Sequence, residues 1–174
     1  MSNAQLVLEF AAAPLTDADE FAAWIVASNL LTAAPFVSDA HCEDACVLRD
    51  ALSRAMKSVA GGDPLPARDA ATLNSFADED PPRLALRSEG GLARTAPTPV
   101  PAALSVIARA AIELLATRAA DLRLCEADGC GQAFLDDSRG RRRRWCSMTR
   151  CGNRAKVLAF RERRTGAPTR TPAR

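Results

Sequence analysis

The chain has few aromatic residues and few side chains suited to catalysis. Its 174 residues include no tyrosine and one histidine, and aromatic residues make up 5% of the total. A single histidine and the lack of a glycine-rich phosphate loop argue against a Ser-His-Asp enzyme or a nucleotide-binding enzyme, so we expect no enzymatic activity. With so few rings the core must consist mainly of alanine, leucine and valine, a composition that favours helices.

The sequence also lacks the features of a secreted or membrane protein. Its N-terminus has no basic segment, and Glu9 interrupts the short apolar run there, so the segment does not resemble a signal peptide. No stretch approaches the length of a membrane span. We therefore expect a cytoplasmic protein without a membrane partner, whose six cysteines are reduced thiols or metal ligands rather than a disulfide framework.

Charge is distributed unevenly along the chain. Residues 1–117 carry a net charge of −7, whereas residues 118–174 carry +9. An acidic body with a basic end indicates that the end binds a polyanion such as nucleic acid, or docks on the acidic surface of the protein itself. The length allows one medium core and one small module that needs additional stabilisation.

The spacing of apolar residues predicts a mainly helical N-terminal part. A helix is expected from a capping box at Thr16 to about Pro35, a second from Ser38 to the glycine pair at Gly61, and a short third one from Pro66.

The pattern changes in the middle of the chain. Leu84, Leu86 and Leu92, with two glycines between them, predict a small hairpin. The proline-rich run APTPVPA, residues 96–102, predicts a stiff linker. A strong helix is then expected from Leu104 to about residue 123.

Four cysteines form two pairs with the same internal spacing. Cys125 and Cys130 are separated by four residues, as are Cys146 and Cys151, and fifteen residues lie between the pairs. Two such pairs can supply the four soft ligands of tetrahedral zinc; buried thiols or disulfides are the alternative. A module of this size cannot bury enough surface alone, whereas zinc can contribute on the order of 10 kcal/mol. A site filled by four protein ligands leaves no position for a reactive water, so the zinc would be structural.

The C-terminal part resembles a known family. Residues 125–156, including the tetrad Cys151, Gly152, Asn153 and Arg154, resemble the CGNR zinc-finger proteins, which carry an N-terminal ABATE domain and are regarded as stress-related transcription regulators. The resemblance implies one structural Zn²⁺ per chain, held by Cys125, Cys130, Cys146 and Cys151. Members of this family often have an Asp- or Asn-containing segment after the first apolar strand, where this chain has LVLEFAAAP at residues 6–14, so the resemblance implies no ligand site there.

The predicted fold is therefore mainly α. We expect a multihelical ABATE-like domain with a small β-hairpin at residues 5–118, and a treble-clef-like zinc finger with a hairpin and a helix at residues 119–165. Residues 166–174 are expected to be a disordered tail.

Basic residues surround the predicted finger. One group lies between the cysteine pairs, on the hairpin expected there, and the other lies on a final helix that Cys151 is expected to begin. Helical spacing gives no single basic face, which favours contact with phosphates over base reading. A solvated turn is the alternative for the first group, and offsetting the thiolate charge is the alternative for the arginines near the metal. The nucleic-acid-binding candidates are Arg139, Arg141, Arg142, Arg143, Arg144, Arg154, Lys156, Arg161, Arg163 and Arg164.

Other chemically suggestive residues have simpler interpretations. His41, Cys42 and Cys46 resemble a partial metal site, but they lack a fourth ligand and are expected to pack. Asn153 is expected to cap or brace the finger, and Trp145 is expected to pack in the finger core together with Met148.

Two functions from different classes fit these features. The favoured one is a transcription regulator that binds DNA, or RNA, through the zinc finger and its arginines, while the helical domain senses, dimerises or acts as a scaffold. The alternative is a protein-interaction module whose structural finger docks an acidic partner.

Overall fold

The computed structural model describes residues 2–13, 15 and 17–165, with side chains as far as Arg161. The predicted tail, residues 166–174, lies outside this range. The chain divides into two compact units, Met1–Ala120 and Asp121–Arg174. These are called the N-terminal unit and the finger unit below.

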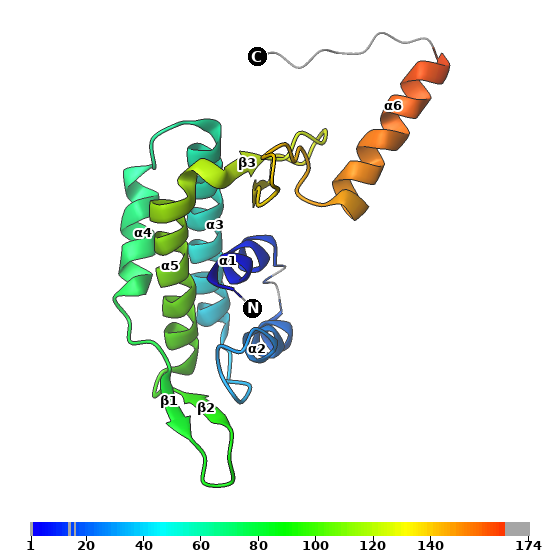
Figure 1. Cartoon of the computed structure of the whole chain (residues 1–174). Helices are drawn as coiled ribbons and strands as arrows, with labels where there is room; N and C mark the ends of the chain where they lie inside the picture. Colours follow the sequence, from blue (N-terminus) through cyan, green and yellow to red (C-terminus); the bar gives the residue numbers. More distant parts are fainter. Residues whose placement is uncertain (1, 14, 16, 166–174) are drawn as a thin grey trace. The chain divides into compact units, whose positions relative to one another are not determined.

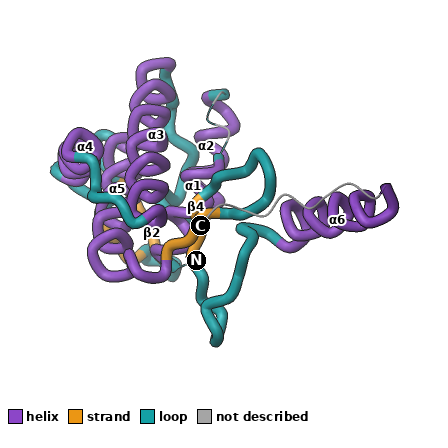
Figure 2. Tube along the Cα trace, turned by 90° about the horizontal axis from the view of Figure 1, so that it is seen from above, coloured by secondary structure: helices purple, strands orange, loops and turns teal. Residues whose placement is uncertain are grey.

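The N-terminal unit is a helical bundle. Its helices are α1 (Asn3–Ala12), α2 (Ala18–Ala27), α3 (Asp39–Gly61), α4 (Ala67–Ala77) and α5 (Pro99–Arg118). Helix α5 packs against α4, α1 and α3, and the two views show α3, α4 and α5 side by side (Figures 1 and 2). Alanine and leucine dominate the buried face of α5, in agreement with the predicted composition of the core.

Helix α3 has the limits that the sequence predicts. Ser38 caps its start, and the backbone N–H of Ser38 donates in return to Nδ1 of His41 at 3.2 Å. Gly62 ends the helix with a left-handed backbone (φ 87°), a conformation that glycine adopts without strain. His41 therefore has a capping role.

The two cysteines of α3 are half-buried. Sγ of Cys46 lies 3.7 Å from the carbonyl oxygen of Leu15. Burial raises the pKa of the Cys42 thiol, and the nearby carboxylate of Asp39 raises it further. A raised pKa keeps the thiol protonated and unreactive at neutral pH.

The start of the chain differs from the prediction. Residues 6–12 of the segment LVLEFAAAP belong to helix α1 rather than to a first apolar strand, and Leu6, Val7 and Phe10 are buried there. This spacing fits the period of a helix, and helical burial determines the conformation. Thr16 lies outside the described residues. Asp17 caps α2, which ends at Ala27 rather than near Pro35.

The prediction of a proline-rich linker is partly wrong. Helix α5 begins at Pro99, inside the run that was predicted to be a linker, and ends at Arg118. Proline is unfavourable in a helix interior but suits the first turn, where its missing N–H would have no partner in any case. Pro99 and Pro101 both lie in that first turn.

The expectation that no segment approaches a membrane span also needs correction. Pro99–Asp121 is long and apolar enough to cross a membrane by length and composition. Most of its apolar window is buried inside the N-terminal unit, which is typical of the central helix of a bundle.

The predicted hairpin is present. Strand β1 (Arg83–Leu86) pairs antiparallel with β2 (Leu92–Thr95), with Leu86 opposite Leu92. The ribbon projects beyond the end of the bundle at which α5 begins (Figure 1).

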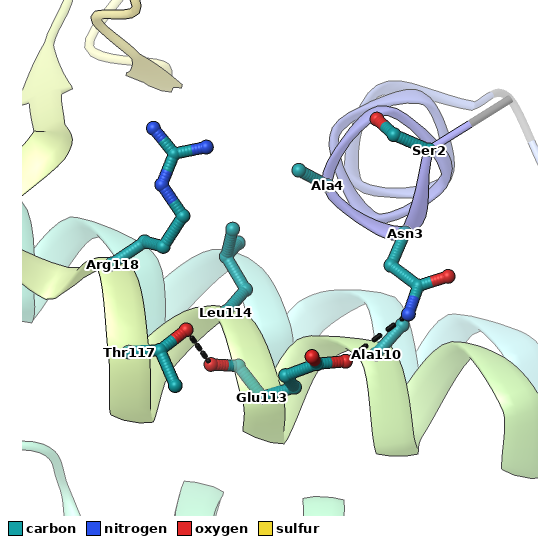
Figure 3. A pocket seen from close by; sticks show the side chains of 8 residues that line it. All are labelled: Ser2, Asn3, Ala4, Ala110, Glu113, Leu114, Thr117 and Arg118. Carbon is teal, nitrogen blue, oxygen red and sulfur yellow. Dashed lines mark hydrogen bonds between the residues drawn. The ribbon is translucent and has the colours of Figure 1, made fainter.

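A pocket of about 290 Å³ lies between α1 and α5 (Figure 3). Its polar side chains are tied to one another, because Nδ2 of Asn3 donates to the Glu113 carboxylate at 3.1 Å. Oγ1 of Thr117 donates to the Glu113 carbonyl at 2.7 Å. The Asn3–Glu113 bond fastens the start of α1 to α5, whereas the Thr117–Glu113 bond lies within α5.

Candidate metal centre

The first cysteine pair lies in the connection between the two strands of a small sheet. Strand β3 (Leu122–Leu124) pairs antiparallel with β4 (Ala133–Leu135), and Cys125 and Cys130 lie in the connection between them. The sequence instead predicted a hairpin between the two cysteine pairs. The described residues 136–147 contain no strand, so the arginine run lies on a loop and not on a hairpin.

Two glycines give this connection its shape. Gly129 and Gly131 have φ values of 69° and 56°, a region that other residues rarely adopt. The N–H of Cys130 donates to the Ala127 carbonyl at 3.0 Å, and the N–H of Cys125 donates to the Gln132 carbonyl at 2.9 Å. The chain therefore folds back tightly enough for both thiols to reach one point.

The second cysteine pair lies around the start of a helix. A π-helical turn, η2 (Met148–Gly152), leads into α6 (Asn153–Thr165), and Ser147 caps the turn by accepting from the N–H of Arg150 at 3.2 Å. Cys146 precedes this cap and Cys151 lies within the turn. The final helix thus follows Cys151, and the turn begins earlier than the sequence suggested.

The four sulfur atoms fit a tetrahedral zinc ion. All four lie within 4.8 Å of one another. Sγ of Cys130 is 3.8 Å from that of Cys146 and 3.6 Å from that of Cys151, and Cys146 and Cys151 are 3.6 Å apart. Zn–S bonds of about 2.3 Å give a tetrahedron with edges of about 3.8 Å. The spacing is close to this value and much longer than a disulfide bond of about 2.05 Å.

The cysteine thiols of the cluster differ in pKa. Burial raises the pKa of Cys146 to about 12, and hydrogen bonds with the neighbouring thiols contribute. Burial acts in the same direction on Cys125, but N–H groups of Cys146 and Ala127 donate to its sulfur and, with the other thiols, lower its pKa to about 7. Since the thiols do not all ionise together at neutral pH, a metal ion would have to displace the remaining protons.

Family models match both units. The ABATE model, described as "Putative stress-induced transcription regulator", matches residues 4–118, and the CGNR zinc finger model matches residues 122–164. The chain belongs to the ABATE family and carries a C-terminal CGNR zinc finger. The CGNR finger holds one structural zinc ion through its four cysteines. No curated protein matches the chain.

The four residues that give the CGNR finger its name, Cys151 to Arg154, all have structural roles. Cys151 contributes a sulfur ligand. A side chain at Gly152 would meet Sδ of Met148 at 2.9 Å and Cε3 of Trp145 at 3.4 Å. Nδ2 of Asn153 donates to the Thr149 carbonyl at 3.2 Å, so Asn153 braces η2. Nη2 of Arg154 donates to the Asp128 carbonyl at 2.8 Å and ties α6 to the first cysteine pair.

The finger has a small apolar core beside the sulfurs. Phe134 is buried with Cys125, Ala127 and Cys151, and Trp145 packs against this cluster, as predicted. Met148 was predicted to belong to the core, but it is about half-exposed at 47%. Only the end of its side chain, which lies against Gly152, packs in the finger.

Many of the candidate arginines make contacts inside the finger. Arg141 pairs with Asp121 at 2.7 Å, and Arg144 pairs with Glu126 at 2.6 Å. Arg143 donates to the carbonyls of Trp145 and Cys146 and lies 5.1 Å above the ring of Phe134. These guanidinium groups hold the loop around the metal site.

The remaining candidates face solvent or lie beyond the described side chains. Arg139, Arg142 and Lys156 are exposed and make no ion pair with any described residue. Arg161 has a contact of its own. The side chains of Arg163 and Arg164 lie outside the described residues. The structure thus separates exposed cations that make no ion pair with described residues from exposed cations that make contacts within the finger.

Sequence reasoning missed the residue that organises the arginine loop. The buried carboxylate of Asp136 accepts from the N–H of Ser138 at 3.0 Å, from its hydroxyl at 2.5 Å and from the N–H of Arg143 at 2.9 Å. These bonds, with the Ser138 hydroxyl as the largest cause, lower the pKa of Asp136. The pattern Asp-x-Ser is typical of a side chain that caps its own turn, and it could have revealed this role.

Proposed function

We propose that the protein is a transcription regulator that binds DNA through the CGNR finger, by contacts with the phosphate backbone. The finger unit supplies two basic elements, the loop that carries Arg139 and Arg142 and the helix α6 that carries Lys156. The observation that carries the proposal is that these three cations are exposed and make no ion pair with described residues, so phosphates can contact them without breaking the fold.

Charge supports the same proposal. The C-terminal residues 118–174 carry +9, and four thiolates with one zinc ion reduce this by two. The remaining charge is large for so short a segment and acts on any polyanion, independent of sequence. The proposal therefore concerns affinity for phosphates and assigns no base-reading role.

The proposal includes no catalytic role for the zinc ion. Four cysteine sulfurs complete its tetrahedral coordination, whereas catalytic zinc keeps one position open for water or substrate. The metal would act by holding the loop and α6 at a fixed separation, because each element is joined directly to a ligand.

Salt dependence of binding tests this function. The zinc-loaded full-length chain is titrated with labelled duplex DNA, and anisotropy gives the affinity over a series of salt concentrations. We expect the logarithm of the affinity to fall linearly with the logarithm of salt concentration. The double variant Arg139→Ser/Arg142→Ser should reduce the slope by about 1.8, since each lost phosphate contact contributes about 0.9.

A matched control removes the same charge elsewhere. Lys57→Ser/Arg87→Ser changes two exposed cations of the N-terminal unit and should leave the slope unchanged. Absence of binding to duplex DNA and to RNA at low salt would overturn the proposal and favour an acidic protein partner. Equal slopes for the two double variants would show that net charge alone governs binding.

A further inference from the structure

The β1–β2 ribbon turns its leucines toward solvent. The register places Leu84, Leu86 and Leu92 on one face, because Leu86 lies opposite Leu92 and Leu84 lies opposite Arg94. Their exposed fractions are 67%, 86% and 46%. The opposite face carries Ala93, which is buried. A solvent-facing cluster of large apolar residues is unusual on a monomer and marks a surface that contacts something else.

The same ribbon has one closed edge and one open edge. On β2, the N–H of Arg94 donates to Oγ1 of Thr32 at 2.6 Å, and the Arg94 carbonyl accepts from the N–H of Thr32 at 3.2 Å. Both backbone groups of Arg94 therefore point away from β1. In an antiparallel pair, the residue opposite then points its own groups away as well. The backbone groups of Leu84 and Leu86 thus face outward along the edge of β1, where the described residues provide no partner strand.

We propose that a second copy of this chain covers this edge, with β1 pairing antiparallel to β1 of the second copy. The register that matches the outward-facing backbone groups places Leu84 opposite Leu86 of the second copy. By symmetry, Leu86 then lies opposite Leu84 of the second copy. This arrangement gives four backbone hydrogen bonds and brings all six leucines to one face of a four-stranded sheet.

Two features favour a second copy over an unrelated strand. The symmetric pairing places Ala85 directly opposite Ala85 of the second copy, at a non-hydrogen-bonded position where Cα atoms approach to about 4.5 Å and a small side chain fits. The outer edges of the resulting sheet are the two β2 strands, where Thr32 already occupies both backbone groups of Arg94. This contact hinders the addition of a further strand at β2, so pairing is expected to stop at two copies.

The charges at the ends of the strand limit the strength of the dimer. The register places Arg83 opposite Arg87 of the second copy, twice, and like charges in such positions repel. The contact is also small compared with stable interfaces of about 1,200 Å² or more. We expect a dissociation constant on the order of micromolar or weaker, which decreases when salt screens the arginines.

Sedimentation of the zinc-loaded full-length chain over a wide concentration range tests the pairing. The wild-type chain should dimerise more tightly at high salt, the opposite of its predicted salt response with DNA. Leu86→Lys should weaken the dimer at least tenfold, because a charged edge opposes pairing. Arg87→Glu should strengthen it at low salt, since its carboxylate would face Arg83 of the second copy. Val47→Lys, an exposed apolar position on α3, serves as control and should change nothing.

A crosslink tests the register itself. Under mild oxidation Ala85→Cys should form a covalent dimer, because the two positions lie within disulfide distance. Ser88→Cys in the turn and the wild-type chain should not. A monomer at every concentration, or a dimer that is indifferent to both Leu86→Lys and Arg87→Glu, would overturn the proposal.

Discussion

Replacing Phe134 by alanine tests whether the finger folds only with its metal. Phe134 is buried against Cys125, Ala127 and Cys151, so the truncation leaves a cavity beside the sulfurs. A buried Phe→Ala change costs about 3–5 kcal/mol. A finger of this size gains its folding free energy from zinc, so folding and metal binding are one equilibrium. The loss should therefore appear as a zinc affinity lower by about 10² to a few thousandfold, at 1.4 kcal/mol per factor of ten.

Competition with a chromophoric chelator measures this affinity on the full-length chain. Phe21→Ala is the matched control, because Phe21 is equally buried but lies in α2 of the N-terminal unit. It should lower the thermal stability of that unit and leave the zinc affinity unchanged. If Phe134→Ala bound zinc within a factor of three of the wild type, packing and metal binding would be independent, and coupled folding would be refuted.

Three further outcomes are expected. A strong chelator should unfold the finger and leave the N-terminal helices intact, which circular dichroism with amide NMR can resolve; loss of the whole fold would contradict the two-unit division. Arg54→Met should lower the urea unfolding free energy by about 3 kcal/mol, because it removes both hydrogen bonds to Oδ1 of the fully buried Asp69 carboxylate and leaves only Arg68 at 3.7 Å, and an unchanged midpoint would argue against this. Arg143→Ser should lower zinc affinity about tenfold by removing two carbonyl contacts, whereas the adjacent Arg142→Ser should not, and equal effects would refute the separation of the two arginines.

Local signals predicted the elements whose determinants are close in sequence. Ser38 and Gly62 define α3 because a capping side chain and a left-handed glycine act within one turn. The cysteine spacing predicted the metal site for a related reason, since each pair needs only one short turn to bring its sulfurs together.

Other features depend on contacts that the sequence does not reveal. The composition of the arginine run does not reveal whether an arginine binds phosphate or supports the fold. That role depends on partners that are distant in the sequence. Arg141 pairs with Asp121 and Arg144 pairs with Glu126, 20 and 18 positions away, respectively. The start of α5 is a different case, because the rule against proline in helices applies only beyond the first turn.

The charge asymmetry of the chain can be interpreted more specifically when arginines that make contacts within the finger are distinguished from those that do not. Ion pairs with Asp121 and Glu126 neutralise two of them inside the finger, and others are committed to carbonyl groups near the sulfurs. The exposed excess is then concentrated on the loop between Cys130 and Cys146 and on the helix that follows Cys151. A fixed spacing between these two elements is what a charged surface needs to match successive phosphates, and the metal ligands connect them, together with the hydrogen bond from Arg154 to the Asp128 carbonyl. Zinc would therefore control polyanion binding through geometry, since the zinc–thiolate group itself is negative and would weaken binding.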